Sequence, residues 1–259
     1  MIRELLLNYV KIDNVYVDGS LSYNRPLKNI ESIAVPGRNG NLIIDYGTWQ
    51  NVVITYPCYM IADDVDDFNT KYSALVNRLA GISGYVRLTD RIDGVDPSHY
   101  RLARPIVPQT VTLKDVDRKA FFNLSFDCKP QRFLRSGDSI EGINAGGSRT
   151  LTNPTPNPAR PMISVNLGSA ESGTVQIGDT TITVSGIPTS ESHVIEIDCE
   201  TMQCYTKIPN QGWINRNKNV SFSTNDFPTL PAGDTTITVP AVASGGAARV
   251  TITPHWWEL

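Results

Sequence analysis

The sequence predicts a mainly β protein with two domains: a β-rich N-terminal domain over residues 1–135 with one α-helix, and an antiparallel β-sandwich over 136–259. Three observations lead to this prediction. Only one segment has helical periodicity, short alternating apolar segments fill the remainder, and the composition changes near the middle of the chain. Threonine rises from 6 residues before position 135 to 17 after it, which favours two differently built domains.

The one helical segment follows an acidic stretch, Asp63 to Asp67, and ends at Gly81. Acidic side chains stabilise the positive end of a helix dipole, and glycine is a common residue after the last turn. The apolar residues between them step by three and four: Val65, Phe68, Tyr72, Leu75, Val76 and Leu79. We therefore expect an amphipathic helix of about four turns that packs this stripe on a sheet.

Strands are expected on both sides of that helix because β-branched and aromatic residues alternate with polar ones. In the first domain the expected strands are residues 5–12, 28–35, 42–45, 52–59, 85–88, 100–104 and 121–127. The second and third of these flank Pro36, Gly37, Arg38, Asn39 and Gly40. The two glycines can adopt positive φ and Pro36 ends the ladder, so this segment is expected to form a tight hairpin tip.

In the second domain the expected strands are residues 162–167, 193–198, 204–208, 220–222 and 249–253, with turn signals about every ten residues. That spacing is typical of a sandwich. The heptapeptide Gly-Asp-Thr-Thr-Ile-Thr-Val occurs twice, at 178–184 and 233–239. We expect the same local structure in both places, a Gly-Asp turn that leads into a strand.

Net charge and hydropathy exclude several classes of protein. A net charge of −3 gives no electrostatic footprint for nucleic acid or for an anionic membrane. The N-terminal residues do not read as a signal peptide, and no apolar run reaches the roughly 20 residues of a membrane span. We therefore expect a protein that is made and assembled in the cytoplasm.

The four cysteines, Cys58, Cys128, Cys199 and Cys204, are expected to be reduced thiols, since none forms a C-x-x-C pair. Cys199 and Cys204 bracket a predicted hairpin loop. A disulfide there would close a very short loop and add little stability.

Catalytic and metal-binding patterns are sparse, so the sequence predicts neither an enzyme nor a cofactor. His99, His193 and His255 are the only histidines, and no G-x-S-x-G motif is present. Asp90, Asp93 and Asp96 do not follow the calcium-loop spacing. No Cys and His set has zinc-ligand spacing.

Trp213, Trp256 and Trp257 are candidate ligand contacts, because an aromatic face can stack on a sugar ring, and amides close to Trp213 could bind the hydroxyls of that sugar. The amides in question belong to Asn210, Gln211, Asn215 and Asn217. The alternative is that Trp213 caps a loop, with its indole N–H bonded to backbone, while Trp256 and Trp257 close the sandwich at the last strand.

Taken in order along the chain, these features resemble the distal tail protein family of siphophages, often called Dit. The resemblance rests on the Pro36–Gly40 hairpin, the single helix, and a seam at Phe126, Cys128, Pro130, Arg132 and Phe133. It also rests on later segments at Ile197-Asp198, 227–233 and 252–257, which are similar to the galectin-like domain of that family.

The resemblance implies an N-terminal domain that forms a hexameric ring and a galectin-like C-terminal sandwich. It implies a hub at the virion tail tip, with the tail tube protein and a tail-associated hub or fibre protein as partners. Residues 1–134 carry 16 basic and 15 acidic residues, a balance that suits contacts between copies. The alternative function is a lectin-like module that recognises a host-surface glycan.

Overall fold

The computed structural model describes residues 3–18, 24–95, 97–108, 110–114, 118–188, 193–208 and 212–259. The chain divides into two compact units, residues 1–132 together with Leu259, and residues 133–258. This division lies between Arg132 and Phe133, inside a strand, whereas the sequence-based boundary lies between residues 135 and 136.

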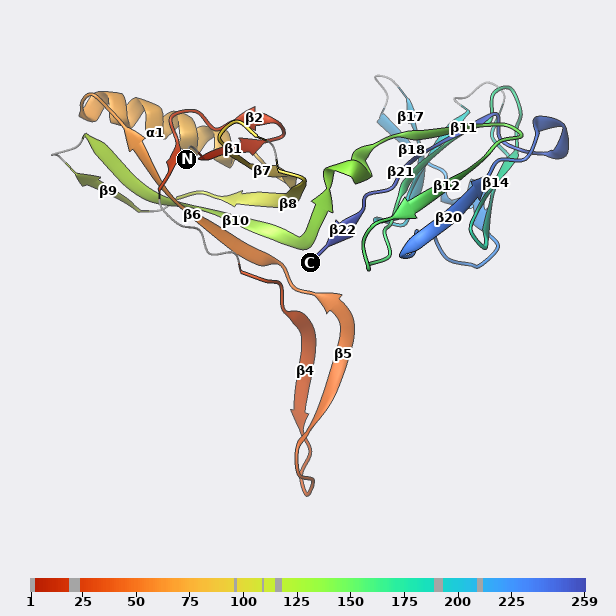
Figure 1. The fold of residues 1–259 in the computed structure, drawn as a ribbon, viewed down its shortest axis with the longest axis horizontal. Helices are drawn as coiled ribbons and strands as arrows, with labels where there is room; N and C mark the ends of the chain where they lie inside the picture. The colour runs from red at the N-terminus through yellow and green to blue at the C-terminus, as the bar shows by residue number, and fades with distance from the viewer. Residues whose placement is uncertain are drawn as a thin grey trace. The chain divides into compact units, whose positions relative to one another are not determined.

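The first unit contains eight strands of a nine-stranded antiparallel sheet and one α-helix among its described residues, and the ninth strand, β22, belongs to the second unit (Figure 1). Seven strands follow the order β2-β1-β7-β8-β10-β6-β3, and β9 and β22 also pair with β10. The strands are β1 (Arg3–Leu7), β2 (Val10–Lys11), β3 (Tyr16–Val17), β6 (Val52–Ile61), β7 (Val86–Ile92), β8 (His99–Ile106), β9 (Val111–Lys114) and β10 (Lys119–Leu134), with β22 at Trp257–Glu258.

The core of this unit lies between the sheet and helix α1 (Val65–Ala80), as the sequence pattern predicts. Phe68, Leu75 and Leu79 are buried, whereas Val65 at the start of the stripe is exposed. Tyr72 links the helix to the sheet. Its ring packs edge-on against Phe122 of β10 at 6.1 Å, and its hydroxyl donates to the Pro108 carbonyl oxygen at 3.1 Å.

The acidic residues before α1 form its N-terminal cap. The Asp64 carboxylate accepts from the Asp67 backbone N–H at 2.8 Å, and the Asp67 carboxylate accepts from the Asp63 N–H at 2.9 Å. The first bond satisfies a donor that the first helical turn leaves without an intrahelical partner, and the second ties the residue before the cap to that turn. Lys71 donates to Asp67 at 2.7 Å and, as the largest cause, lowers the pKa of that carboxyl group.

The strand expected over residues 5–12 is wrong, because the chain turns back inside it. Asn8 and Tyr9 have φ of 48° and 69°, so they form a two-residue turn between β1 and β2. Arg87 holds this turn: its backbone N–H donates to the Asn8 side chain at 3.0 Å. Its guanidinium stacks over the ring of Tyr100 at 3.4 Å and hydrogen-bonds the Tyr9 hydroxyl.

A separate two-stranded sheet consists of β4 (Lys28–Ala34) and β5 (Asn41–Trp49), joined by the predicted tip at residues 36–40. We call β4, the tip and β5 the ribbon. Gly37 and Gly40 have φ of 77° and 82°, the positive values expected at the tip. Nearly every residue of the two strands is exposed.

The second unit is an antiparallel sandwich of a six-stranded and a five-stranded sheet. The six-stranded order is β11-β21-β13-β16-β17-β18, and the five-stranded order is β12-β20-β14-β15-β19. The strands are β11 (Glu141–Asn144), β12 (Ser148–Asn153), β13 (Met162–Asn166), β14 (Gly173–Ile177), β15 (Thr180–Val184), β16 (Val194–Asp198), β17 (Gln203–Ile208), β18 (Gly212–Asn215), β19 (Val220–Phe222), β20 (Gly233–Thr238) and β21 (Arg249–Thr253). Alternate residues of both sheets, such as Ile195, Ile252 and Ile182, form one buried core.

The repeated heptapeptide adopts two different structures, so the expectation of one local structure is wrong. Gly178 and Asp179 form the two-residue turn between β14 and β15, where Ile177 pairs with Thr180. Gly233 and Asp234 instead lie inside β20 and pair with Asn153 and Thr152 of β12. The partner strand decides the outcome, because a glycine with positive φ (54° and 84° here) can serve either in a turn or at the start of a strand.

The beginning and the end of the second unit are joined by backbone hydrogen bonds. The Leu134 N–H donates to the Trp256 carbonyl oxygen at 2.8 Å, and the His255 N–H donates to that of Gly137 at 2.9 Å. Trp256 is buried in the core, and the Trp257 indole N–H donates to the Pro158 carbonyl oxygen at 3.0 Å. These tryptophans thus close the sandwich at the last strand.

All four cysteines are buried free thiols. Burial is the largest cause that raises the pKa of Cys58, Cys128 and Cys204 to about 12, and it raises the pKa of Cys199 as well. None of the helices in the described ranges has both the length and the apolar character that a bilayer span needs.

Gly137→Ala should destabilise the second unit. A Cβ at this position would overlap the backbone nitrogen of Trp256 and lie 3.2 Å from the backbone carbon of His255, and backbone atoms cannot move aside as a flexible side chain can. We expect a loss of about 1–3 kcal/mol in the free energy of unfolding, measured by urea denaturation. Gly84→Ala is the matched control, because nothing lies within 4 Å of its added Cβ. Equal stability of the two variants would contradict this packing.

Stability should fall as pH rises above about 8.5, the ordinary pKa of a thiol in an unfolded chain. The unfolded thiols lose their protons above that pH while the buried ones keep them, so the folded state binds more protons and is penalised. Each thiol contributes roughly 1 kcal/mol for each pH unit until its folded pKa is reached. Urea denaturation of the reduced protein and of Cys128→Ala between about pH 8 and 10 measures this, and the variant should have the smaller slope. Identical slopes would show that Cys128 titrates normally.

Candidate functional site

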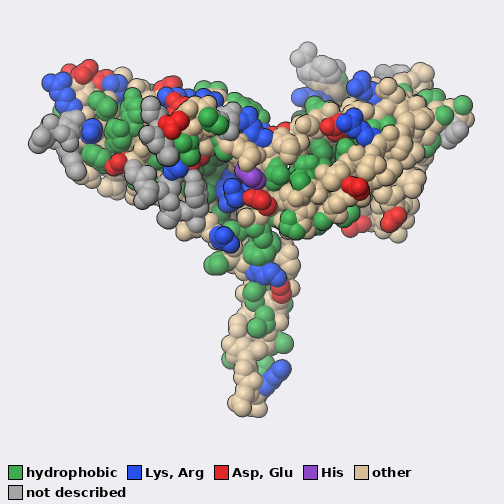
Figure 2. Space-filling model, in the orientation of Figure 1, with side chains coloured by type: hydrophobic (Ala, Val, Ile, Leu, Met, Phe, Trp, Pro, Cys, Tyr) green, Lys and Arg blue, Asp and Glu red, His purple; other side chains and the backbone are tan. Residues whose placement is uncertain are grey.

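The ribbon carries apolar side chains on both of its faces. Directly opposite residues of an antiparallel pair point to the same face. Ile33 lies opposite Leu42 and Glu31 opposite Ile44 on one face, while Ser32 opposite Ile43 occupies the other face. Figure 2 shows hydrophobic side chains along the ribbon with few charged ones among them. Several of them are strongly exposed, including Ile43 at 66%.

The base of the ribbon is fixed by a break in its ladder. Lys28 pairs with Trp49 and Ile30 with Asp45, so β5 has extra residues at this point, and Gly47 takes φ of 68°. The Asp45 carboxylate accepts from the Gly47 N–H at 2.9 Å and from Lys28 at 2.7 Å. The Lys28 bond is the largest cause that lowers the pKa of Asp45. Such a bulge twists a strand pair and limits further pairing at that level.

The tip residues lie together in one turn, and the contacts around them indicate a structural role. The Arg38 N–H donates to the Val35 carbonyl oxygen at 3.2 Å, which closes the turn, and Pro36 and Asn39 lie in the same exposed segment. No atom comes within 4 Å of a Cβ added to Gly37 or Gly40. Their role is therefore conformational.

The residues of the predicted seam all lie on β10 and belong to different parts of the structure. Phe126 and Cys128 are in the core of the first unit, and Phe133 is buried at the start of the second. The Pro130 carbonyl oxygen accepts from Arg101 of β8 at 3.1 Å. Arg132 is the last residue before the division and lines a cavity of the first unit.

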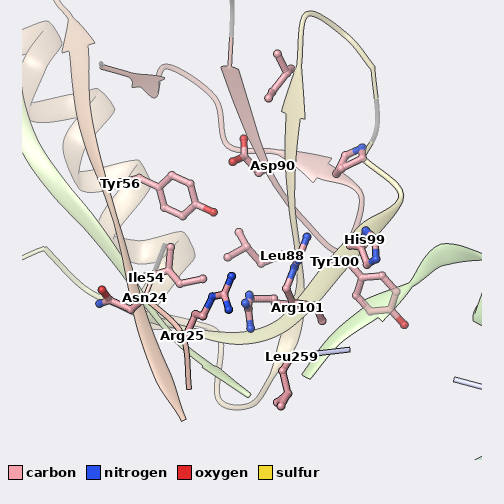
Figure 3. Close-up of a pocket in the computed structure, with 13 residues that line it drawn as sticks. Asn24, Arg25, Ile54, Tyr56, Leu88, Asp90, His99, Tyr100, Arg101 and Leu259 are labelled. Atoms are coloured by element: carbon pink, nitrogen blue, oxygen red, sulfur yellow. The ribbon is translucent and has the colours of Figure 1, made fainter. Parts of the chain in front are cut away.

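That cavity has a volume of about 490 Å³ (Figure 3). Its lining combines apolar groups such as Ile54 and Leu88 with Arg25, Arg101 and Arg132. Asp90 also lines it and is paired with Arg3 at 3.2 Å. His99, another lining residue, lies 2.7 Å from the Ser98 hydroxyl, a neighbour in sequence.

Within the described ranges, no group of three or more His, Cys, Asp or Glu side chains could hold a metal ion. Asp96, the third residue of the calcium-like spacing, lies outside those ranges, as do Asn210 and Gln211 of the tryptophan neighbourhood. The His193 Nε2–H donates to the Pro188 carbonyl oxygen at 3.2 Å, a local contact.

Trp213 is not a loop cap. It lies on β18, the last strand of the six-stranded sheet, with 61% of its surface exposed. Tyr205 of β17 packs edge-to-face against it with ring centroids 4.4 Å apart, and Lys207 lies over its ring at 5.4 Å. Tyr205 and Lys207 could have been found from the sequence, since both alternate outward on the strand before Trp213.

The two asparagines named with Trp213 have different surroundings. Asn215 is on β18, and its side-chain oxygen accepts from the Asn217 N–H at 2.9 Å. The Asn217 side-chain oxygen accepts from the Cys204 N–H at 2.6 Å, so this residue holds the chain against β17. Both carbonyl oxygens thus have structural partners.

Comparison with known proteins places the fold. The structure resembles the crystal structure of the SPP1 Dit protein, which is described as a paradigm of the hub adsorption apparatus in phages that infect Gram-positive bacteria. The TM-score is 0.61 and the sequence identity is 12%, and the match covers 97% of this chain and 98% of the SPP1 Dit chain. A chain of the phage P2 baseplate in its activated conformation with calcium matches with a TM-score of 0.52 and 9% identity, over 97% and 98% of the two chains. The same baseplate with strontium gives 0.52 and 8%, over 97% of each chain.

No protein-family model and no curated protein sequence matches the chain. The fold is that of phage tail-hub and baseplate proteins. Within that class it is the fold of a distal tail protein, so the resemblance predicted from sequence is confirmed at the level of the fold. The predicted mainly β class with one α-helix is confirmed as well.

Gly40→Val should disorder the ribbon and leave the core intact. A β-branched residue at φ of 82° carries a strain of about 1–2 kcal/mol, and the open space around the tip offers no contact to offset it. Hydrogen exchange of the β4 and β5 amides should accelerate while thermal melting stays unchanged. Arg38→Val at the same tip is the control, because its φ is not among the positive ones. Equal exchange in both variants would rule out this role for Gly40.

Proposed function

We propose that this protein is a structural component of a phage tail tip, a distal tail protein whose copies form a hexameric ring. The ring joins the tail tube protein to a tail-associated hub or fibre protein during host adsorption. In this proposal the chain assembles in the host cytoplasm, acts in the virion, and needs no catalytic group, nucleic acid or membrane. The shared fold over nearly the full length of the SPP1 Dit protein supports this role.

The observation that supports ring formation most directly is the ribbon, a separate two-stranded sheet with apolar side chains on both faces. An isolated two-stranded sheet is marginally stable in water and needs a further layer or further strands. Its own chain supplies no third strand within the described residues. Burial of the exposed ribbon side chains against a partner would supply the missing stability; they are Ile30, Ile33, Leu42, Ile43 and Tyr46.

A second copy of the chain is the occupant that fits the ribbon best. A head-to-tail contact uses two different surfaces of each copy and closes into a ring when the rotation per subunit is fixed. A two-faced ribbon suits such a contact, because each copy then both inserts its ribbon and receives one. The near balance of basic and acidic residues in the first domain allows complementary rims around that contact.

The double variant Ile33→Asp, Leu42→Asp should remain monomeric. The two residues lie opposite each other on one face, and two carboxylates buried without partners cost at least about 3 kcal/mol at each contact. Light scattering after size-exclusion chromatography gives the mass, with six copies of the 28.5 kDa chain expected for the wild type. Because the wild-type side chains are exposed within one copy, the melting temperature of the monomer should not fall.

Val65→Asp is the control, since it makes the same change at an exposed position of the first unit outside the ribbon. It should leave the ring intact. A wild-type protein that stays monomeric at concentrations of tens of micromolar would contradict the ring. A double variant that still forms six-copy particles would place the contact elsewhere.

A further inference from the structure

The outer face of the six-stranded sheet carries a row of polar and aromatic side chains that neither the fold nor the ring uses. The register places one residue of each strand in this row, in the order Gly142, Thr251, Ser164, Glu196, Tyr205 and Asn215. Their neighbours along the strands, such as Ile195, Ile197 and Cys204, point into the core. The row therefore faces away from the core.

The end of this row at β17 and β18 has the groups that bind a sugar ring. Trp213 keeps most of its surface open, and the edge-to-face contact with Tyr205 fixes the orientation of its indole. An aromatic face attracts the C–H groups on the apolar side of a pyranose. Lys207, opposite Trp213, holds its ammonium group over the Trp213 ring at 5.4 Å from the centroid and brings a hydrogen-bond donor beside the indole.

Hydrogen-bonding groups continue from the aromatic pair along the row. Glu196 lies directly opposite Tyr205 on β16 and accepts from the Ser164 hydroxyl at 3.0 Å. A carboxylate has several acceptor sites, so this bond leaves Glu196 able to accept from vicinal hydroxyls of a ligand. Burial is the largest cause that raises the pKa of Tyr205, and the carboxylates of Asp198 and Glu196 add to it, so its hydroxyl remains a neutral donor near pH 7.

Strand spacing sets the length of the ligand. Neighbouring strands are about 4.8 Å apart and each residue along a strand adds about 3.3 Å, so Glu196 on β16 lies two strand steps across and two residues along from Trp213 on β18, on the order of 12 Å. One pyranose covers the aromatic pair, and a second unit is needed to reach Glu196 and Ser164. Lys207 and Glu196 have opposite charges, which gives the site no net preference for an acidic or a basic sugar.

We propose that Trp213, Tyr205, Lys207, Glu196 and Ser164 form a binding site for a neutral oligosaccharide of at least two units. The first sugar stacks on Trp213 beside Tyr205, and the second is held by Glu196 and Ser164. Asn215 and Asn217 have a supporting role, since their carbonyl oxygens are bonded to backbone N–H groups. This site lies in the second unit and does not depend on ring formation.

A saccharide fits this surface better than a protein partner does. The aromatic pair is bordered by hydroxyl, carboxylate, ammonium and amide groups and not by a wider apolar patch, whereas the fully buried centre of a protein interface is depleted of charged residues. Addition of a peptide strand to β18 is also disfavoured. The strand has four residues, begins at Gly212 with φ of 92°, and is followed by the Asn215–Asn217 turn.

The test uses the full-length protein and four neutral disaccharides: cellobiose, maltose, lactose and diacetylchitobiose. Saturation-transfer NMR with titration measures their affinities beside those of glucose, galactose and N-acetylglucosamine. At least one disaccharide should bind about tenfold more tightly than its monosaccharide. Trp213→Ala should weaken both by about tenfold or more, whereas Glu196→Gln should weaken only the disaccharide.

Two control variants and a mass measurement distinguish an effect on sugar binding from an effect on folding or on ring formation. Trp213→Phe keeps an aromatic face and should retain part of the affinity, and Thr236→Ala on the outer surface of the five-stranded sheet should change nothing. Light scattering should give the same particle mass for all variants, so loss of sugar binding with an intact particle concerns this site alone.

Three results would overturn the proposal. The first is the absence of binding for every disaccharide at millimolar concentrations. The second is equal affinity of the wild type and Trp213→Ala. The third is a Trp213→Ala variant that loses a protein partner from the tail while no sugar binds the wild type, which would assign the aromatic pair to protein docking.

Discussion

Strand β10 is the element on which the rest of the structure depends. Its 16 residues pair with β6 over Lys119–Cys128 and with β9 over Lys119–Phe122, and β8 pairs with it too. Buried residues alternate along it, including Phe122, Leu124, Phe126 and Cys128, so it supplies much of the first core. The same strand then enters the second unit, where Leu134 bonds to Trp256. A shift of one residue in β10 would turn its core side chains toward solvent.

The ribbon differs from β10, because nearly all of its strand residues are exposed within its own chain. Its ladder of hydrogen bonds and its positive-φ glycines define its shape, but they leave its apolar side chains in water. Natural proteins protect exposed strand edges, and large apolar surfaces that remain open commonly mark interaction sites. The ribbon and the outer row of the sandwich are therefore two surfaces with different chemistry. The first suits a copy of the chain and the second suits a polar ligand.

Local patterns in the sequence predicted the elements whose structure is decided locally. The capping acids, the apolar stripe and Gly81 define α1, and the glycines at the tip define the ribbon turn. The sequence-based predictions were wrong where the local structure depends on partner residues that are distant in sequence. The identical heptapeptides differ because one pairs back on β14 and the other pairs with β12, which is distant in sequence. The turn at Asn8 and Tyr9 was missed because neither residue is glycine, and Arg87 from a distant strand supports it.

At the candidate site, too, one part could be predicted from local sequence and the other depends on distant strands. Trp213 could be selected as an exposed aromatic from its polar neighbourhood, but its partners could not, because Glu196 and Ser164 reach it through strand register and not through sequence proximity. Asn217 was selected because it is close to Trp213 in the sequence, but its side-chain oxygen accepts a hydrogen bond from the Cys204 backbone N–H. The seam residues likewise share a strand but divide between two cores.

The central claim is that copies of the chain close into a ring through the ribbon, and electron microscopy of the full-length protein tests it most directly. The account predicts closed particles with six-fold symmetry in which density for β4 and β5 lies between neighbouring copies. Single copies, open filaments, or rings in which the ribbon contacts no neighbour would contradict it.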